Sequence, residues 1–193
     1  MRRDAAINRD RLIRAAEEVF AARGSAATLD DVAKAAGVGP ATLYRRFANK
    51  DALVAEVLSG YFQRLIALAE IAEHAPAQRC LDVFLQTVGV ELAEKAGLAA
   101  PEWGDLAPKP LVEELRRRSS ALLTRAQQSG AVRRDVNPAD ITAAVWALRG
   151  VIHSERTDAD YRGQALWRRH LQTILRGFRN RRLGHSATAS ITP

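Results

Sequence analysis

Apolar residues recur along the chain at the three- and four-residue spacing of an α-helix. No run of β-branched residues alternates with polar ones as a strand would require. Gly and Pro residues divide the pattern into separate elements. The predicted helices cover about residues 8–23, 29–36, 40–47, 50–74, 76–96, 111–129, 137–152 and 160–178, with at most one short helix in the Pro- and Gly-rich segment 97–110. The pattern therefore predicts an all-α protein of about nine helices, with a three-helix head followed by a helical body.

Residues 28–47 have the spacing of a helix-turn-helix. Thr28 is suited to cap the first helix, and Gly37 supplies the positive φ that the turn needs. Leu43 and Phe47 are expected to hold the second helix against the first. The outer surface then carries Pro40, Ala41, Thr42, Tyr44, Arg45 and Arg46. Such a surface suits a DNA groove, although an ordinary helical hairpin with a solvated basic face has the same pattern.

The charge is unevenly distributed along the chain. The net charge of +7 divides into +4 over residues 1–50, zero over 51–178 and +3 over 179–193. A basic head on a neutral body favours a polyanionic partner at one end of the molecule, whereas a solubilising excess without a partner is the simpler alternative.

The run from Thr28 to Leu53 closely resembles the N-terminal signature of TetR-family transcriptional regulators. The preceding helix, which ends at Gly24, fits the same family, and the resemblance covers about residues 8–55. The rest of the chain matches in length and helix number only. The resemblance implies a DNA-binding regulator, most simply a repressor that binds a palindromic operator as a homodimer and is released by a small molecule.

The resemblance also implies roles for single residues. Phosphate contacts fall to Thr28, Thr42, Tyr44 and Lys50, and Arg45 stands at a variable position where a base contact is expected. Three residues depart from the family pattern: Gly39 replaces a common Ser, Ala41 a common Gly and Arg46 a common His. The expected DNA-binding set is Thr28, Gly39, Pro40, Ala41, Thr42, Tyr44, Arg45, Arg46 and Lys50.

The chain is expected to divide into a DNA-binding domain (1–50), a ligand-binding and dimerisation domain (51–178) and a disordered basic tail (179–193). Two apolar stripes on the last two helices are the candidate dimer interface, since the family pairs these helices across a two-fold axis. The stripes contain Ile141, Ala144, Val145, Leu148, Ile152, Trp167, Leu171, Ile174 and Phe178. Packing of both stripes inside one chain is the alternative.

A ligand cavity in the body is a further expectation from the family. Its candidate residues are Phe62, Leu65, Phe84, Val88, Trp103, Leu106, Leu122, Trp146 and His153. Each of these also fits a plain core position. Because the charges of the body cancel, the expected ligand is a small apolar or amphipathic molecule.

Other functional classes have little support. The single cysteine, Cys80, excludes a disulfide framework and a multi-cysteine metal site. The four histidines show no ligand spacing, and neither a nucleophile motif nor a Gly-rich phosphate loop occurs, so no cofactor, no metal and no catalysis are expected. The charged N-terminus and the absence of a long apolar run favour a cytoplasmic protein. Two alternatives remain: a helical binding module without DNA recognition and a helical enzyme. Salt-dependent binding to a palindromic duplex would distinguish a DNA-binding regulator from both.

Overall fold

The computed structural model describes residues 2–99 and 101–180. Over these residues the chain forms eight α-helices and three short 3-10 helices, and its β-type pairing is an isolated bridge between Val132 and Arg179. The elements are α1 (Arg2–Arg23), η1 (Gly24–Ala26), α2 (Leu29–Ala36), α3 (Pro40–Arg46), α4 (Lys50–Glu73), α5 (Cys80–Glu94), η2 (Ala96–Ala99), η3 (Pro101–Leu106), α6 (Lys109–Gln128), α7 (Pro138–Thr157) and α8 (Leu166–Phe178). The predicted all-α fold is confirmed.

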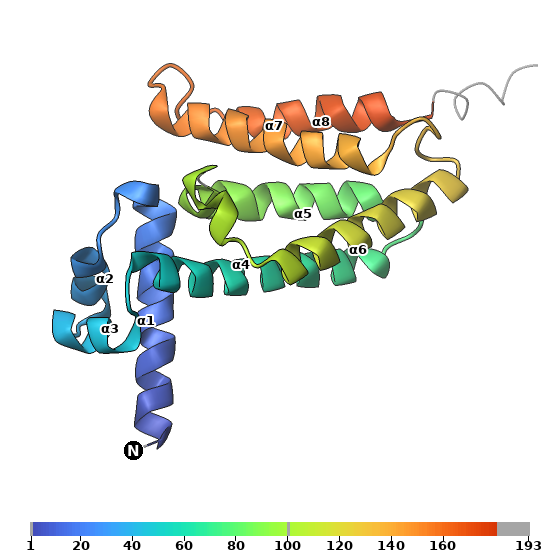
Figure 1. Ribbon diagram of the computed structural model, residues 1–193. Coiled ribbons are helices and arrows are strands. Elements are labelled where there is room, and N and C mark those ends of the chain that lie inside the picture. The colour runs from blue at the N-terminus through green and yellow to red at the C-terminus, as the bar shows by residue number, and fades with distance from the viewer. Residues whose placement is uncertain (1, 100, 181–193) are drawn as a thin grey trace, which may run out of the picture.

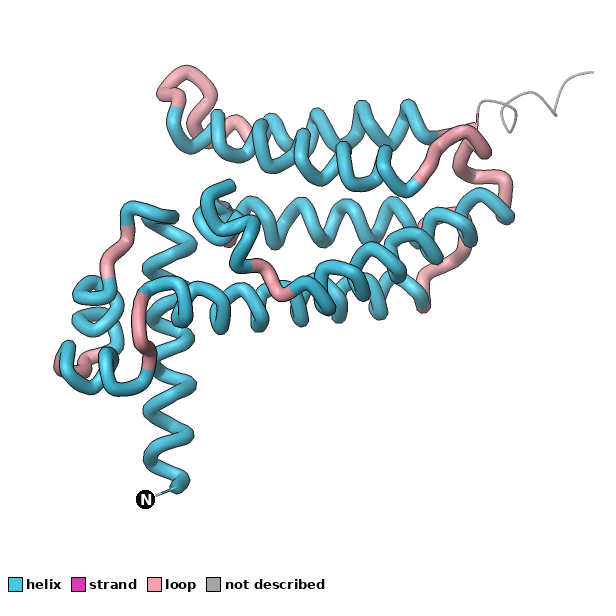
Figure 2. Tube along the Cα trace, in the orientation of Figure 1, coloured by secondary structure: helices cyan, strands magenta, loops and turns pink. Residues whose placement is uncertain are grey.

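The helices form a layered body with a head at one end (Figure 1). In the body, α7 and α8 form one layer, α5 lies beneath them, and α4 and α6 lie on the other side of α5. The head consists of α1, α2 and α3, and α1 runs crosswise to the body helices with its N-terminus pointing away from them. Short loops make most of the connections (Figure 2).

Local signals account for α2 and for its sharp end. Thr28 and Asp31 form a reciprocal capping box, and Leu29 and Val32 are buried on the inner face. Gly37 ends the helix in the left-handed conformation with φ of 66°, as its position in the turn predicts. These features turn the chain from α2 into α3, which packs against α2.

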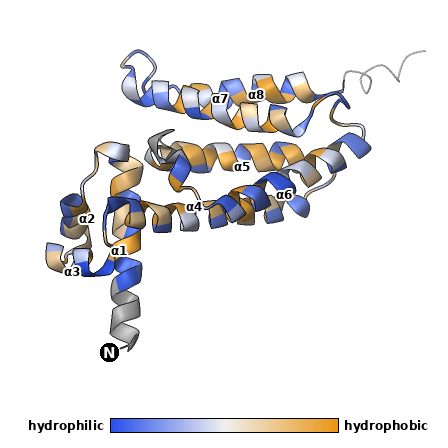
Figure 3. Ribbon diagram, viewed as in Figure 1, coloured by the Kyte–Doolittle hydropathy of each residue, from blue (hydrophilic) through white to orange (hydrophobic). Residues whose placement is uncertain are grey.

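The apolar core continues from the head into the body, and the inner faces of the helices are correspondingly apolar (Figure 3). Phe20, Leu53 and Leu85 are among its fully buried side chains, from α1, α4 and α5 respectively. By length and composition α4 could cross a membrane, but it packs between α1, α5 and α6 as a core helix of this fold does. Cys80 is buried, and burial raises the pKa of its thiol.

Several predicted element ends differ from the structure. The last helix begins at Leu166 instead of about residue 160, because residues 158–165 form a turn that ends with Ala165 at φ of 50°. The expected tail starts too early: Arg179 forms an ion pair with Asp82 at 3.0 Å, and the Asn180 N–H donates to a carbonyl of the body. The remainder of that tail, 181–193, lies outside the described residues.

The candidate dimer stripes require a correction. Ile141, Ala144, Leu148, Ile152, Trp167 and Leu171 are buried within the chain. The reason is that α7 and α8 turn these stripes towards α5, where Gly89 lets the Trp167 ring approach: a Cβ at Gly89 would lie 2.5 Å from a ring carbon. The other three residues, Val145, Ile174 and Phe178, are partly buried. The six buried side chains belong to the core of one chain and are not available to a partner.

Candidate nucleic-acid interface and ligand cavity

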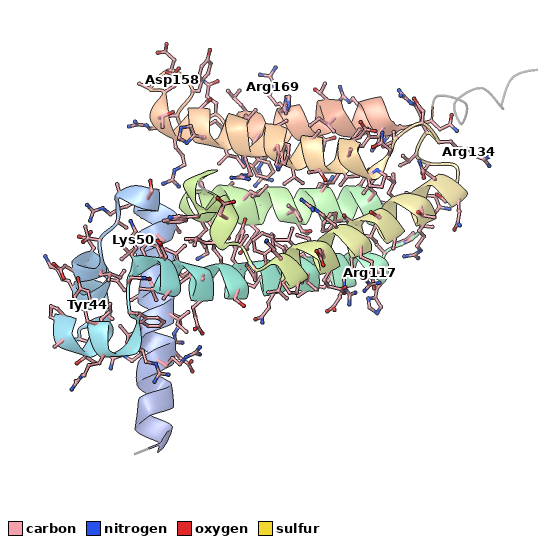
Figure 4. All side chains as sticks on the ribbon, viewed as in Figure 1. Tyr44, Lys50, Arg117, Arg134, Asp158 and Arg169 are labelled. Carbon is pink, nitrogen blue, oxygen red and sulfur yellow. The ribbon has the colours of Figure 1, made fainter. Side chains whose placement is uncertain are left out.

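The outer surface of α3 carries the polar residues that the sequence assigns to DNA. Leu43 and Phe47 are buried and fix the inner face of this helix. Tyr44 is 53% exposed, and Arg45 and Arg46 beside it are also exposed. Figure 4 places Tyr44 on the outer side of the head, away from α5, α6, α7 and α8. A phenol and two guanidinium groups are therefore all exposed on one short helix.

The remaining predicted residues of α3 lie around this group. Pro40 and Ala41 are exposed at the start of the helix, and Thr42 is partly exposed and accepts a hydrogen bond from Arg45 at 3.4 Å. Gly39 is exposed as the N-cap, and open space surrounds the position of a Cβ there. Every predicted DNA-binding residue between 39 and 46 is thus at least partly exposed.

Thr28 is already engaged within the head. Its hydroxyl donates to Asp31 Oδ2 at 2.7 Å and accepts from the Asp31 N–H at 3.1 Å. Asp31 Oδ2 accepts hydrogen bonds from the Thr28 hydroxyl and, at 2.9 Å, from the Thr28 N–H; these two bonds, with a smaller contribution from the Arg23 guanidinium, lower the pKa of the carboxyl to about 2. A phosphate contact by the Thr28 hydroxyl would have to replace part of the capping box, whereas its role as helix cap is direct.

Lys50 lies where the head meets the body (Figure 4). Its Nζ donates to the Ser25 carbonyl oxygen at 2.6 Å, and its side chain is partly exposed at the start of α4. An ammonium group has three donors, so the bond to Ser25 leaves donors for a phosphate.

A cavity of about 200 Å³ lies between α4, α5, α6 and α7. Six of the predicted ligand residues line it: Phe62, Leu65, Phe84, Val88, Trp103 and Trp146. Three do not. Leu106 is partly buried in η3 and Leu122 is a core residue of α6, while His153 is exposed and lines a separate hollow.

Tyr61, which the sequence reasoning missed, also lines this cavity. Its side chain is 3% exposed, and its hydroxyl has no hydrogen-bond partner among the described residues. Burial raises the pKa of this phenol above its usual range, so the hydroxyl stays protonated and can donate. A buried hydroxyl without a partner has a cost of about 1–3 kcal/mol, which a ligand acceptor would relieve. A tyrosine on the same helical face as Leu58, Leu65 and Phe62 was the available signal.

The cavity touches the head through Trp103. The Trp103 ring packs edge-on against Phe20 of α1, with 5.3 Å between the ring centroids. Beside them η2 approaches α1 so closely that a Cβ at Gly97 would collide with the Phe20 carbonyl oxygen. Along the chain α4 runs from the head into the body, and the contact between Trp103 and Phe20 is a second junction between the two.

Ion pairs strengthen the same junction. Arg64 of α4 binds Glu17 of α1 at 2.8 Å and Glu91 of α5 at 2.9 Å, and Lys95 binds Glu17 at 2.9 Å. Three helices from head and body are therefore joined by one network of half-buried charges.

Comparisons with known proteins agree with this architecture. Residues 12–57 match the family model of bacterial regulatory proteins of the TetR family, and residues 68–180 match that of the SbtR-like transcriptional regulator C-terminal domain. The chain belongs to the TetR family of helix-turn-helix, DNA-binding transcriptional regulators, which is not a family of enzymes. The resemblance predicted from residues 8–55 is confirmed and extends through the body.

Particular relatives show how far the similarity reaches. An uncharacterized HTH-type transcriptional regulator of Mycobacterium tuberculosis is 31% identical over 149 residues, which cover 74% of this chain and 70% of that protein. The crystal structure of a TetR regulator from Mycobacterium vanbaalenii has 30% identity and a TM-score of 0.64, covering 93% of this chain and 99% of that one. A TetR regulator from Streptomyces coelicolor has 27% identity and a TM-score of 0.62, covering 90% and 99%.

Proposed function

We propose that this protein is a ligand-responsive repressor that binds a palindromic operator as a homodimer through α3. The observation that carries the proposal is the exposure of Tyr44, Arg45 and Arg46 on a helix whose inner face is pinned by Leu43 and Phe47. Arginine can bind guanine O6 and N7 with two hydrogen bonds, and a tyrosine hydroxyl can donate to a phosphate. In this arrangement Arg45 contacts a base edge, and Tyr44, Thr42 and Lys50 bind the backbone.

A single head of this size contacts one half-site, so a second copy is needed for a full operator. An exposed face of α7 offers a surface for pairing, with Ala143, Trp146 and Gly150 at helical spacing, and the Trp146 ring also borders the cavity. Small residues beside an exposed tryptophan allow two helices to approach closely. This face replaces the buried stripes as the candidate interface.

The cavity beneath α7 is the proposed effector site. Its walls are mainly apolar, and the Tyr61 hydroxyl supplies a buried donor that no described residue accepts. Such a site favours a small apolar or amphipathic molecule with one hydrogen-bond acceptor. The contact between Trp103 and Phe20 links a wall of the cavity to the core of the head.

Release from DNA follows from a population shift. A ligand that fits the cavity better in one arrangement of head and body stabilises that arrangement by its difference in affinity. If the favoured arrangement holds the two heads at the wrong spacing, operator affinity falls by the same factor.

Selection of genomic fragments by the purified protein, followed by footprinting of the bound duplexes, tests the proposal. We expect two symmetry-related protected stretches about one helical turn apart, near 34 Å. Binding should weaken steeply with salt, and Lys50→Ala should reduce the slope of log K against log salt by about one, the value for a single phosphate. Binding without sequence preference or symmetry would contradict a dimeric operator complex.

A further inference from the structure

A second hollow of about 540 Å³ lies between the head and the body. Its head side is formed around Gly24 at the end of α1 and η1, and its body side comes from η2 and the C-terminal half of α7. In Figure 1 the end of α1 and η1 lie beside the end of α5, below α7. The hollow is distinct from the effector cavity described above, which lies between α4, α5, α6 and α7.

The charged side chains that line this cleft all have the same sign. They are Arg23, Arg149 and Arg156, accompanied by His153, and none of the lining residues is an aspartate or glutamate. This is a local segregation, because residues 51–178 as a whole contain equal numbers of acidic and basic residues. A concave surface with basic side chains and no acidic ones attracts anions.

The basic groups of the cleft are held by the protein in different ways. The Arg156 guanidinium donates to the Ala22 carbonyl oxygen at 2.9 Å, so it bridges the cleft while retaining its full charge. The ion pairs found among the described residues do not include Arg156 or His153. Arg23 is paired with Asp31 at 2.6 Å and contributes less.

The basic cleft and the apolar cavity are neighbours. Leu92, Trp146 and Arg149 line both of them. Trp146 lies at the boundary of the two hollows, and because its side chain is 63% exposed, the core does not hold its ring in place. A molecule with its apolar part in the cavity can therefore place its other end in the cleft by passing these three residues.

We propose that the cleft binds the anionic end of an amphipathic ligand, a carboxylate or a phosphate, while the apolar part of the same molecule lies in the cavity. The position of the apolar part rests on the proposed function; the anion site rests on Arg149, His153 and Arg156. This identifies the ligand as an anion, although the overall charge of the body gave no reason to expect one.

The location of the anion gives it a direct effect on the head. One wall of the cleft belongs to α1 and η1, and the other belongs to α7. The Arg156 guanidinium donates across the cleft to the Ala22 carbonyl oxygen and has further N–H donors, so an anion bound to them lies beside the contact that joins the two walls. Occupation of the cleft thus favours a different separation of head and body from the one in the free protein.

Calorimetric titration of the full-length protein with three ten-carbon compounds tests the proposal. Decanoate and monodecyl phosphate carry an anionic end, and decanol is the neutral equivalent. A charge-assisted hydrogen bond corresponds to a gain of roughly tenfold to a hundredfold in affinity, so at least one of the two anions should bind at least about tenfold more tightly than decanol. The anion that binds more tightly identifies the headgroup class.

Variants locate the effect. Arg156→Gln should reduce the affinity of the anion to near that of decanol and leave decanol binding unchanged. Arg149→Gln should also reduce the affinity of the anion. This second variant keeps the test valid if Arg156→Gln disturbs the junction between head and body. Arg169→Gln is the matched control, because this arginine is exposed on the outward face of α8 (Figure 4) and should leave all affinities unchanged.

The outcomes separate this proposal from the proposed function. If decanol binds and both anions bind no more tightly, the anion site is refuted while the apolar cavity stands. If Arg156→Gln and Arg149→Gln both leave the preference for the anion intact, the cleft is not its site. Failure of all three compounds to bind a protein that still binds its operator refutes the amphipathic ligand and leaves the DNA-binding part of the proposed function intact.

Discussion

The head and the body place their chemistry on opposite sides of their helices. The head buries its apolar side chains and projects Tyr44, Arg45 and Arg46 outward, where a large rigid partner can reach them. The body keeps its distinctive group inside, as the Tyr61 hydroxyl in a cavity. The exposed groups of the head therefore suit a macromolecular partner, and the cavity of the body suits a small molecule. The junction around Trp103 connects the two regions.

The largest expected effect is at Trp103, which belongs to both regions. Trp103→Ala removes a buried ring that packs against Phe20, and comparable substitutions cost about 3–5 kcal/mol in free energy of unfolding. Tyr161→Ala is the control, because this aromatic side chain is 45% exposed in the turn before α8, and it should change stability by less than about 0.5 kcal/mol. Urea unfolding measures both, and equal losses would contradict the assignment of Trp103 to the junction.

The close approach of η2 to α1 gives the next largest effect. Gly97→Ala introduces a Cβ that collides with the Phe20 carbonyl oxygen, so backbone must move, and the expected loss is about 1–3 kcal/mol. At Gly104, in the neighbouring 3-10 helix, a Cβ meets nothing within 4 Å, and Gly104→Ala should be nearly neutral. A Gly97→Ala protein as stable as the Gly104→Ala protein would show that the junction is loose.

A smaller effect is expected within the head alone. Thr28→Ala removes the side chain that caps α2 and should lower the free energy of unfolding by about 1 kcal/mol. Thr124, exposed in α6 with its hydroxyl bonded to the Ser120 carbonyl, provides the control Thr124→Ala, which should have little effect. Chemical denaturation compares the two, and no difference between them would mean that the cap contributes nothing.

Acid should weaken the same cap gradually. The pKa of Asp31 is lowered from 3.8 to about 2 in the folded chain, so its contribution to stability is present above pH 4 and is lost as the pH falls towards 2. The difference in melting temperature between the wild type and Asp31→Asn should therefore shrink over this range. A difference that is constant from pH 5 to pH 2 would exclude the ionised carboxylate as its source.

The same contrast explains what could be predicted from the sequence. The capping box at Thr28, the turn at Gly37 and the outward position of Tyr44 depend on neighbours a few residues away, and each was predicted correctly. Family resemblance and local spacing pointed to the same residues there.

Features that depend on distant neighbours were harder to predict. The sequence of α7 and α8 alone does not indicate whether their apolar stripes face a partner or α5. The packing depends on Gly89 in α5, where the absence of a Cβ leaves room for the Trp167 ring. Likewise, the basic cleft brings Arg23 next to Arg149 and Arg156, which follow it by more than a hundred positions in the sequence. The Trp103 contact with Phe20 has the same origin.

The most direct test of the account measures the base preference of the Arg45→Ala protein on the selected operator. Duplexes with single base-pair changes should show relaxed preference at one position in each half-site, with a cost of about 1–3 kcal/mol on the preferred sequence. Arg134→Ala, at the end of the body far from the head, should bind every duplex as the wild type does (Figure 4). If Arg45→Ala also binds every duplex as the wild type does, the outer surface of α3 is not the surface that recognises DNA sequence.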